Sequence, residues 1–422
     1  MGKGVFFNLP GATGHINPAF GIVSELIRHG EQVVFYADPE VAPKFNALGA
    51  EARDYRKWSA YDHQPDIAAD LVSVGIELFE MTEQCLLGLL RELQEDRPDY
   101  IIYDSCAPWG PLLADRLGIP SVKVVTHVLW TTRMSLDARH WMNVDMLSMI
   151  PRNYRLDSRI RGAKLAISAR RRFRDMLDSL GLPRQSLLKD MLRIFRRPGE
   201  MTICVTSARY QPYADTMGEH VYFVGASVPE YRDDQVFQRA SEASRPLIYI
   251  SLGSVHNQKL DFYRQCIAAF ADSPYEVVIS VGKQTALADL GIIPTNIRVF
   301  PWVPQLKVLQ HASLFISHGG MNSINESLYF DVPLLMVPQQ IEQAYNARRI
   351  QQLGAGRCLR PGRVTPMRLR NLSEHILEEP SYRRQAALVG ESVRAGGHQR
   401  AAQLILNHLR GSAQTDQRVL AA

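Results

Sequence analysis

The sequence predicts an α/β fold made of two doubly wound domains, each built on a parallel sheet. Its 422 residues are too many for one ordinary core and suit two domains. Short apolar runs alternate with longer segments in which apolar residues recur at helical spacing. The runs are apolar throughout, as in strands that helices cover on both faces of a parallel sheet.

The first half of the chain shows this alternation from its first residues. An apolar run at residues 5–9 ends at Pro10-Gly11, and a helical pattern then opens at Asn17-Pro18 and closes at His29-Gly30. Later elements follow with short loops. Strands are expected over residues 32–36, 100–103 and 121–125, and a helix over residues 109–117.

The pattern restarts after a polar stretch, residues 225–246, which we interpret as an interdomain linker. Expected beyond it are strands at 247–252, 276–281, 297–300, 314–317 and 333–337, and a helix at 260–271. The linker thus separates an N-terminal domain, residues 1–224, from a C-terminal domain, residues 247–395. We expect the last segment, 396–422, to form a helix near 398–410 that packs back on the N-terminal domain, followed by a poorly ordered tail.

Composition excludes several classes of protein. The net charge of +5 is modest for this length and gives no indication of nucleic-acid binding. The five cysteines are scattered and include no CxxC pair, so we expect no disulfide framework or zinc site and favour a reducing compartment. No signal-peptide pattern and no window of 18 uninterrupted apolar residues occur, so we expect a cytoplasmic protein, monomeric or homodimeric.

One segment is strongly basic. Residues 152–197 carry fourteen Lys and Arg against four acids. A solvated helical face is the ordinary explanation, and the alternative is a weak contact with an anionic membrane surface or an anionic ligand.

The corner after the expected strand 314–317 has the composition of a phosphate site. His318-Gly319-Gly320 follows the strand, and Asn322, Ser323 and Glu326 come next. Backbone amides at a helix N-terminus are unpaired and favour negative charge, and glycines let a ligand approach them. His318 can donate to a diphosphate oxygen, and Glu326 suits the hydroxyls of a ribose, although an ordinary glycine turn is the alternative.

The wider window, residues 302–346, resembles the nucleotide-sugar signature of the UDP-glycosyltransferase superfamily. Trp302-Val303-Pro304-Gln305 precedes the corner, and Val332-Pro333 and Glu342-Gln343 follow it at the family's spacing. HGGMNS and PQQIEQ are similar to the bacterial macrolide-glycosyltransferase branch. Asp331 departs from the family, in which many members have glycine before Val-Pro, and we expect this change to affect the turn more than donor binding.

The resemblance implies a GT-B fold, in which two Rossmann-like domains face each other across a cleft, and a set of donor contacts. Trp302 would stack on uracil, and the backbone of Val303 would bind the edge of that base. The ribose would lie on Gln305 and Glu326. The diphosphate would lie on Ser254, His318, Gly320, Asn322 and Ser323, and the sugar hydroxyls on Glu342 and Gln343.

The loop at residues 10–15, Pro-Gly-Ala-Thr-Gly-His, follows the first strand and lacks a dinucleotide fingerprint. Its His15 is the side chain best suited to take a proton near neutral pH, although a helix-capping role is the alternative. Asp104, directly after the strand at 100–103, matches the family's partner acid and would orient His15, although a loop-capping acid is the alternative. Asp99 precedes that strand and so belongs at the wrong end of the sheet.

These features predict an inverting transfer of a hexose, most simply glucose, from a UDP-sugar co-substrate to a small hydrophobic acceptor such as a macrolide or flavonoid. The chain contains no Asp-x-Asp pair, and a helix N-terminus can neutralise the diphosphate instead, so we expect no essential metal. We also expect no cofactor, since the UDP-sugar is a co-substrate. The acceptor would contact the N-terminal domain. Its candidate residues are Phe79, Trp109, His127, Trp130, Met134 and Trp141.

Three other functions remain open at this point. A biosynthetic transferase could act on a lipid, a peptide or an anionic metabolite, as the basic segment would allow. A UDP-sugar epimerase on the same fold would isomerise its donor without an acceptor. A non-enzymatic nucleotide-binding protein would bind UDP and lose nothing when His15 is replaced.

Overall fold

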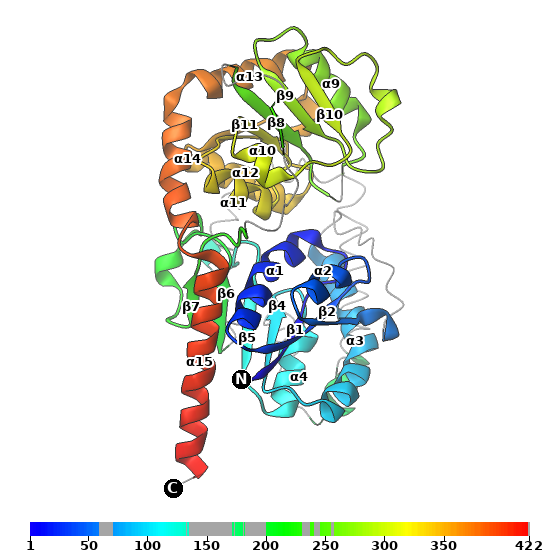
Figure 1. The fold of residues 1–422 in the computed structure, drawn as a ribbon, viewed down its shortest axis with the longest axis vertical. Coiled ribbons are helices and arrows are strands. Elements are labelled where there is room, and N and C mark those ends of the chain that lie inside the picture. Colours follow the sequence, from blue (N-terminus) through cyan, green and yellow to red (C-terminus); the bar gives the residue numbers. More distant parts are fainter. Residues whose placement is uncertain are drawn as a thin grey trace. The chain divides into compact units, whose positions relative to one another are not determined.

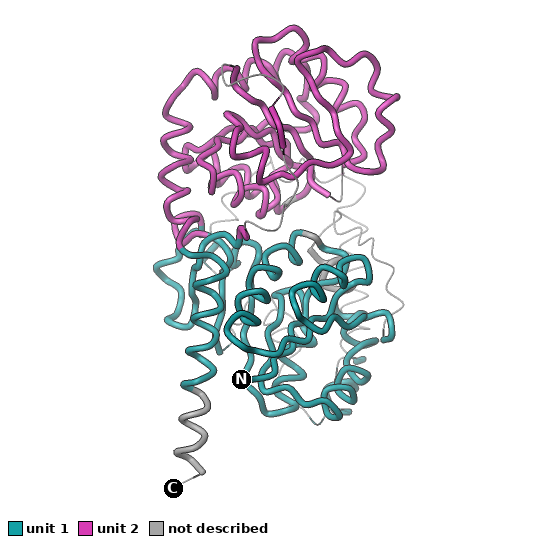
Figure 2. The backbone as a smooth tube through the Cα atoms, in the orientation of Figure 1, with its two compact units in different colours: residues 1–206, 211–227, 396–422 teal, residues 207–210, 228–395 magenta. Residues whose placement is uncertain are grey.

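Two parallel sheets organise the protein in the computed structural model (Figure 1). It describes residues 1–58, 71–131, 133–134, 171–172, 174–179, 181, 200–229, 237–239, 245–254 and 257–420. Figure 2 shows the division into unit 1, residues 1–206, 211–227 and 396–422, and unit 2, residues 207–210 and 228–395. No described helix has the length and the apolar run needed to cross a membrane.

The sheet of unit 1 has seven strands in the order β3-β2-β1-β4-β5-β6-β7, and every pair is parallel. The order reverses between β1 and β4, and ligands of doubly wound folds bind at the carboxyl ends of the strands at such a point. The bounds are β1 Lys3–Phe7, β2 Gln32–Ala37, β3 Glu51–Asp54, β4 Tyr100–Asp104, β5 Ser121–Val125, β6 Met201–Cys204 and β7 Val221–Phe223.

Helices cover both faces of this sheet. On one face Phe6 and Phe35 pack with residues of α1 (Thr13–Arg28) and α15 (Gly397–Leu420). On the other face Phe7 and Tyr103 pack with residues of α3 (Leu71–Glu95) and α4 (Trp109–Leu117). The shorter elements are α2 (Ala42–Ala47), η1 (Tyr55–Lys57) and η2 (Ala214–Thr216).

Helix α1 begins four residues earlier than the sequence indicated. Ala12 is its N-cap, and its carbonyl accepts the N–H groups of His15 at 2.8 Å and Ile16 at 3.1 Å. Pro18 therefore lies inside the helix, where it cannot donate to the carbonyl four residues back. The early start places His15 in the first turn.

Helix α15 was expected to end near Gly411, and it instead extends to Leu420. Gly411 does not adopt the left-handed conformation that ends many helices, so it does not act as a stop. The first part of α15 packs on α1, with Ala401, Ala402 and Ile405 fully buried.

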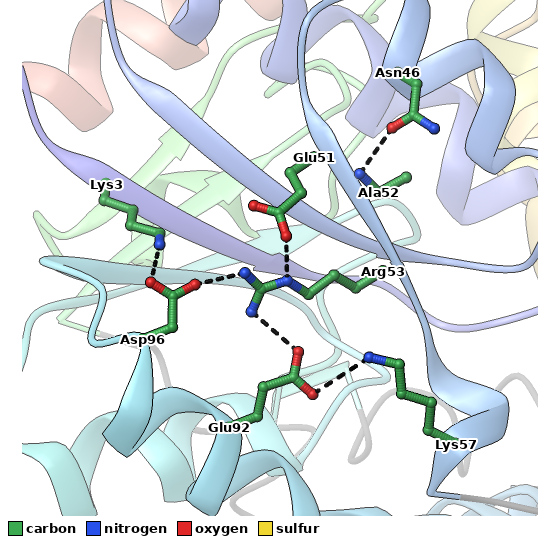
Figure 3. A network of polar contacts seen from close by, with 8 residues as sticks. All are labelled: Lys3, Asn46, Glu51, Ala52, Arg53, Lys57, Glu92 and Asp96. Atoms are coloured by element: carbon green, nitrogen blue, oxygen red, sulfur yellow. Dashed lines mark hydrogen bonds and ion pairs between the residues drawn. The ribbon is translucent and has the colours of Figure 1, made fainter.

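A charged network fixes α3 to the sheet (Figure 3). Arg53 of β3 donates to Glu51 at 2.7 Å, to Glu92 of α3 at 3.0 Å and to Asp96 at 2.5 Å. Asp96 also accepts a hydrogen bond from Lys3 of β1. The bonds from Lys3 and Arg53 lower the pKa of Asp96, but this carboxylate is 40% exposed, so its contribution to stability is small.

Docking of α15 on α1 is expected to weaken in acid because of His398. A Cβ on Gly21 of α1 would lie 2.7 Å from His398 Cγ, which shows how closely the ring packs. Burial lowers the pKa of His398, with Glu25 opposing and Arg28 adding to the shift. The unfolded chain takes up this proton near pH 6.5, but the folded chain does so only at lower pH, so stability falls as the pH drops below about 6.5.

The urea midpoint should therefore fall more between pH 7.5 and 5.5 for the wild type than for His398→Gln, which cannot titrate. Replacement of the exposed His311 by Gln is the matched control. An equal loss in the wild type and in His398→Gln would contradict this role for His398.

The sheet of unit 2 has six parallel strands in the order β10-β9-β8-β11-β12-β13, with its reversal between β8 and β11. The strands are β8 Leu247–Ser251, β9 Glu276–Ser280, β10 Ile297–Phe300, β11 Ala312–Ser317, β12 Leu334–Met336 and β13 Gly356–Cys358. The helical elements are α9 Leu260–Phe270, η4 Leu287–Leu290, α10 Gln305–Leu309, α11 Met321–Tyr329, α12 Ile341–Gln352, η5 Pro361–Arg363, α13 Pro366–Glu378 and α14 Pro380–Val393.

The turn before β12 explains why Asp331 can replace the family's glycine. Its φ of 57° lies in the left-handed region, which glycine adopts freely and Asp tolerates better than most residues. Its carboxylate accepts a hydrogen bond from Arg394 Nη1 of unit 2 at 2.8 Å. This contact stabilises the turn and involves none of the candidate donor residues.

Candidate active site

A sharp corner between β11 and α11 forms the centre of the candidate donor site in unit 2. Gly319 has φ +89°, and Gly320 is the N-cap of α11. Ser317 Oγ accepts the Gly319 N–H at 3.2 Å, and Asn346 Nδ2 donates to the Gly319 carbonyl at 3.0 Å. The corner thus directs the first turn of α11, with Asn322 and Ser323, to the carboxyl end of the sheet, where an anion is favoured.

The ring of His318 lies between two glycines. A Cβ on Gly253, in the loop after β8, would lie 2.6 Å from His318 Cε1. A Cβ on Gly320 would lie 2.6 Å from His318 Nε2. These positions accept no side chain while the ring stays where it is. The same β8 loop carries Ser254, which is exposed.

The residues expected to hold a nucleoside also lie in unit 2. Trp302 is 48% exposed, which is unusual for so large an apolar ring and leaves it free to stack, whereas Val303 beside it is buried. Gln305 Nε2 donates to Glu326 Oε2 at 2.6 Å, and Tyr249 Oη donates to Gln305 Oε1 at 3.1 Å. The structure therefore brings together the amide and the carboxylate that the sequence assigned to the ribose.

The two expected sugar contacts begin α12. Glu342 is exposed, in the first turn, and Gln343 is buried. Gln343 Oε1 accepts the backbone N–H of Gln339 at 2.8 Å, which leaves the amide group of Gln343 to donate elsewhere. Gln343 thus has a structural role that the sequence did not indicate.

A histidine–aspartate pair lies at the carboxyl edge of the sheet in unit 1. His15 Nδ1 lies 2.9 Å from Asp104 Oδ2 and 3.0 Å from Thr126 Oγ1. Asp104 is 1% exposed, and its Oδ1 accepts the Cys106 N–H at 2.7 Å. We assign the shared proton to Nδ1, because an ionised carboxylate can only accept, and this assignment leaves the lone pair on Nε2. This is the tautomer of a general base.

Comparison with known proteins identifies the family. The chain is 32% identical to NDP-glycosyltransferase YjiC of Bacillus subtilis (strain 168), over 96% of this chain and 97% of the relative. The chain belongs to the nucleotide-sugar-dependent glycosyltransferases. It is also 30% identical to demethyllactenocin mycarosyltransferase of Streptomyces fradiae, over 95% of this chain and 85% of that protein. Residues 264–398 match the family model "Erythromycin biosynthesis protein CIII-like, C-terminal domain", which places this glycosyltransferase in the macrolide-type branch.

Solved structures support the same assignment for the fold of the glycosyltransferase. The crystal structure of CalG4, the calicheamicin glycosyltransferase, matches with a TM-score of 0.80 and 26% identity over 97% of this chain and 98% of that one. The glycosyltransferase of kitacinnamycin matches with a TM-score of 0.79 and 28% identity over 96% and 98%. The two parallel-sheet domains are therefore those of a GT-B enzyme, as the sequence predicted.

Several polar residues near His15 of the glycosyltransferase were not singled out by the sequence. Asp38, after β2, accepts the Gly11 N–H at 2.5 Å and so fixes the loop that leads to His15. Thr126, after β5, contacts His15 directly. Ser105 lies 2.9 Å from His127 Nε2. Their common signal is a polar residue directly after an apolar strand, at the edge where ligands bind.

Lys123 is an unexpected buried cation in β5 of the glycosyltransferase. Burial lowers its pKa to about 8, and the neighbouring Cys106, Cys204 and Asp104 oppose that shift. The sequence did not indicate this buried lysine, because a single lysine within an apolar strand is also typical of an exposed edge position.

The expected acceptor residues of the glycosyltransferase occupy different environments. Trp109 is completely buried, and its ring packs edge-to-face on Tyr55, to which it also donates a hydrogen bond at 3.2 Å. A ring enclosed in the core has no free face, so we assign Trp109 a structural role. Phe79 and Met134 are also buried, whereas His127 and Trp130 are half-buried. Trp141 and most of the basic segment 152–197 lie outside the described residues.

Proposed function

We propose that this glycosyltransferase transfers a hexose, most simply glucose, from a UDP-sugar to a hydroxyl of a small hydrophobic natural product, with inversion at the anomeric carbon. The observation that carries this proposal is the His15–Asp104 pair, whose geometry leaves Nε2 as a base. Relatives named as UDP-glucosyltransferases support the choice of donor.

In the proposed reaction, His15 Nε2 removes the proton of the acceptor hydroxyl as its oxygen attacks the anomeric carbon and the bond to UDP breaks. The carboxylate of Asp104 stabilises the imidazolium that forms. The proton thus moves to His15, and the bonding electrons leave with the diphosphate.

Negative charge grows on the leaving diphosphate, and unit 2 offers groups that would stabilise it. These are the N-terminus of α11, the side chains of Asn322 and Ser323, and a donor nitrogen of His318. Groups fixed before the reaction stabilise developing charge without reorganising. We propose that this arrangement replaces an essential metal ion and that no cofactor is needed.

Glu342 and Gln343 would bind sugar hydroxyls, which favours a hexose over a heavily deoxygenated sugar. His127 and Trp130, which are half-buried, remain the proposed acceptor contacts, whereas Phe79 and Met134 are buried as Trp109 is. The five free thiols agree with a reducing, cytoplasmic setting.

Mass spectrometry of products tests the proposal. The protein would be incubated with UDP-glucose, UDP-galactose or TDP-glucose and with macrolide, flavonoid and simple phenol acceptors, in the presence of EDTA. We expect an acceptor heavier by one hexose, formed fastest from UDP-glucose, with inverted configuration by NMR. Donor isomerised without acceptor would instead indicate an epimerase, and UDP binding without any turnover would indicate a binding protein.

A further inference from the structure

The pair His15–Asp104 has a third metal-binding neighbour. A nitrogen of His15, a carboxylate oxygen of Asp104 and Cys106 Sγ all lie within 4.8 Å of one another. Among the described residues this is the one group of three or more His, Cys, Asp or Glu side chains with such spacing. The Cys106 N–H donates to Asp104 Oδ1 at 2.7 Å, which keeps the Asp104 carboxylate beside Cys106.

Imidazole, carboxylate and thiolate are the ligands that Zn²⁺ prefers, and a site with three protein ligands leaves a fourth position for water. Ligand atoms around a tetrahedral zinc ion lie about 3.5 Å apart. The three atoms lie at most 4.8 Å apart, so this spacing requires shifts of up to about 1.3 Å. If His15 binds through Nδ1, which lies 2.9 Å from Asp104 Oδ2, these two atoms would instead move slightly apart. Mg²⁺ demands six oxygen ligands and is not suited to a thiol.

We propose that His15, Asp104 and Cys106 form a binding site for a zinc-like divalent cation and that the bound cation blocks sugar transfer. The His15 side chain is 21% exposed, so a cation can reach the group from solvent, while Asp104 and Cys106 are buried. The site is inhibitory and not a requirement for the reaction.

Binding of the cation to either nitrogen of His15 would block sugar transfer. If Nε2 binds the cation, the lone pair of the base is consumed. If Nδ1 binds it, the Nδ1 proton moves to Nε2, which again loses its lone pair. In both cases the Cys106 thiol releases its proton to solvent as the thiolate binds the cation.

Charges around the group set the strength of binding. Asp104 attracts the cation, and the buried ammonium group of Lys123, which interacts electrostatically with Asp104 and Cys106, repels it. We therefore expect weaker binding than at a structural zinc site, so that a chelator removes the cation at once.

Cobalt binding tests the site without a sugar acceptor. Co²⁺ added to the full chain at pH 7.5 should give the near-ultraviolet thiolate-to-cobalt absorption band in the wild type and in Cys358→Ala, the matched control in unit 2. The band should be missing in Cys106→Ala, and titration with ZnCl₂ should show affinity at least about tenfold weaker in Cys106→Ala and in His15→Ala. A band that persists in Cys106→Ala, or its absence in the wild type, would overturn the site.

The inhibitory effect rests on the proposed function of His15 and is measured separately. The ratio of transfer rates with and without ZnCl₂ should be low for the wild type, return to one on adding EDTA, and rise in Cys106→Ala. MgCl₂ in place of ZnCl₂ should leave the rate of transfer unchanged. Cobalt binding without inhibition would contradict the role of His15 as base, whereas inhibition equal in the wild type and Cys106→Ala would place the inhibitory cation elsewhere.

Discussion

Replacement of His15 by Ala is expected to lower kcat by about 10²–10⁴-fold while leaving the donor KM nearly unchanged. The reason is that His15 Nε2 is the proposed base, whereas the candidate donor contacts all belong to unit 2. Initial rates with UDP-glucose and an accepted phenol would give both parameters. His29→Ala is the matched control, because His29 lies at the other end of α1, where its Nδ1 donates to the Glu25 carbonyl. A His15→Ala enzyme that retains wild-type kcat would show that another group takes the proton.

Asp104→Asn tests the same hypothesis through the tautomer of His15. The Asn oxygen would accept the Cys106 N–H as Asp104 Oδ1 does now, so the Asn amide group would face His15 Nδ1. An N–H donor there requires a lone pair on Nδ1 and moves the proton to Nε2. This wrong tautomer is expected to cost up to about 10⁴-fold in kcat.

The pH profile separates this effect from general damage. Without the carboxylate, the imidazolium is less stable, so the acidic limb of kcat/KM should move to lower pH in Asp104→Asn. A merely misfolded or weakened enzyme would lose activity at every pH by the same factor. Thr126→Val should move the acidic limb in the same direction but by less, because the Thr126 hydroxyl oxygen also faces His15 Nδ1. Thr126→Ser keeps a hydroxyl group and should leave the limb at its wild-type position.

The sequence predicted elements that contain several apolar residues better than it predicted the charged edge strand. The strand over 121–125, the strand over 297–300 and the helix over 109–117 have the predicted bounds, although the strand over 297–300 is only partly buried. Strand β3, Glu-Ala-Arg-Asp, has no apolar pattern and is held at the sheet edge by charged contacts of Arg53 with Glu92 of α3 and with Asp96. Such tertiary contacts leave no periodic signal in one sequence.

The candidate site shows the same limit. His15, Asp104, Gln305 and Glu326 could be singled out because they match a motif or follow a strand. The structure pairs His15 with Asp104, as expected, and it also joins Gln305 to Glu326, a contact that the sequence did not predict. The burial of Trp109 could not be foreseen, since the sequence does not say which side of a helix faces the core at its first residue. Thr126 was missed because a single threonine after a strand is common.

Replacement of Gly253 by Ala is expected to raise the donor KM by about 10–100-fold. The new methyl group would meet His318 Cε1 at 2.6 Å and Nε2 at 2.9 Å, so the ring must move away from its place beside the α11 N-terminus. Loss of one hydrogen bond to a charged group costs about 1.5–3 kcal/mol, which corresponds to this range. The dissociation constant of UDP, measured by calorimetry, should rise by the same factor.

Backbone strain alone cannot account for a rise of about 10–100-fold in the donor KM. A control variant measures the effect of the strain without the clash. Gly253 has φ +81° and Gly291, in the same unit, has φ +82°, but a Cβ on Gly291 would meet no atom within 4 Å. Gly291 has ψ −151°, a backbone region that is essentially restricted to glycine, so Gly291→Ala should lose about 1–3 kcal/mol of stability and keep its affinity for UDP.

A double-mutant cycle identifies the clash as the cause. In a His318→Ala background the space of the ring is free, so Gly253→Ala should add little further loss of UDP affinity. Equal losses from Gly253→Ala in both backgrounds would show that the glycine acts independently of His318. The loop after β8 would then contact the diphosphate through its own backbone, and the packing of His318 between Gly253 and Gly320 would serve the fold alone.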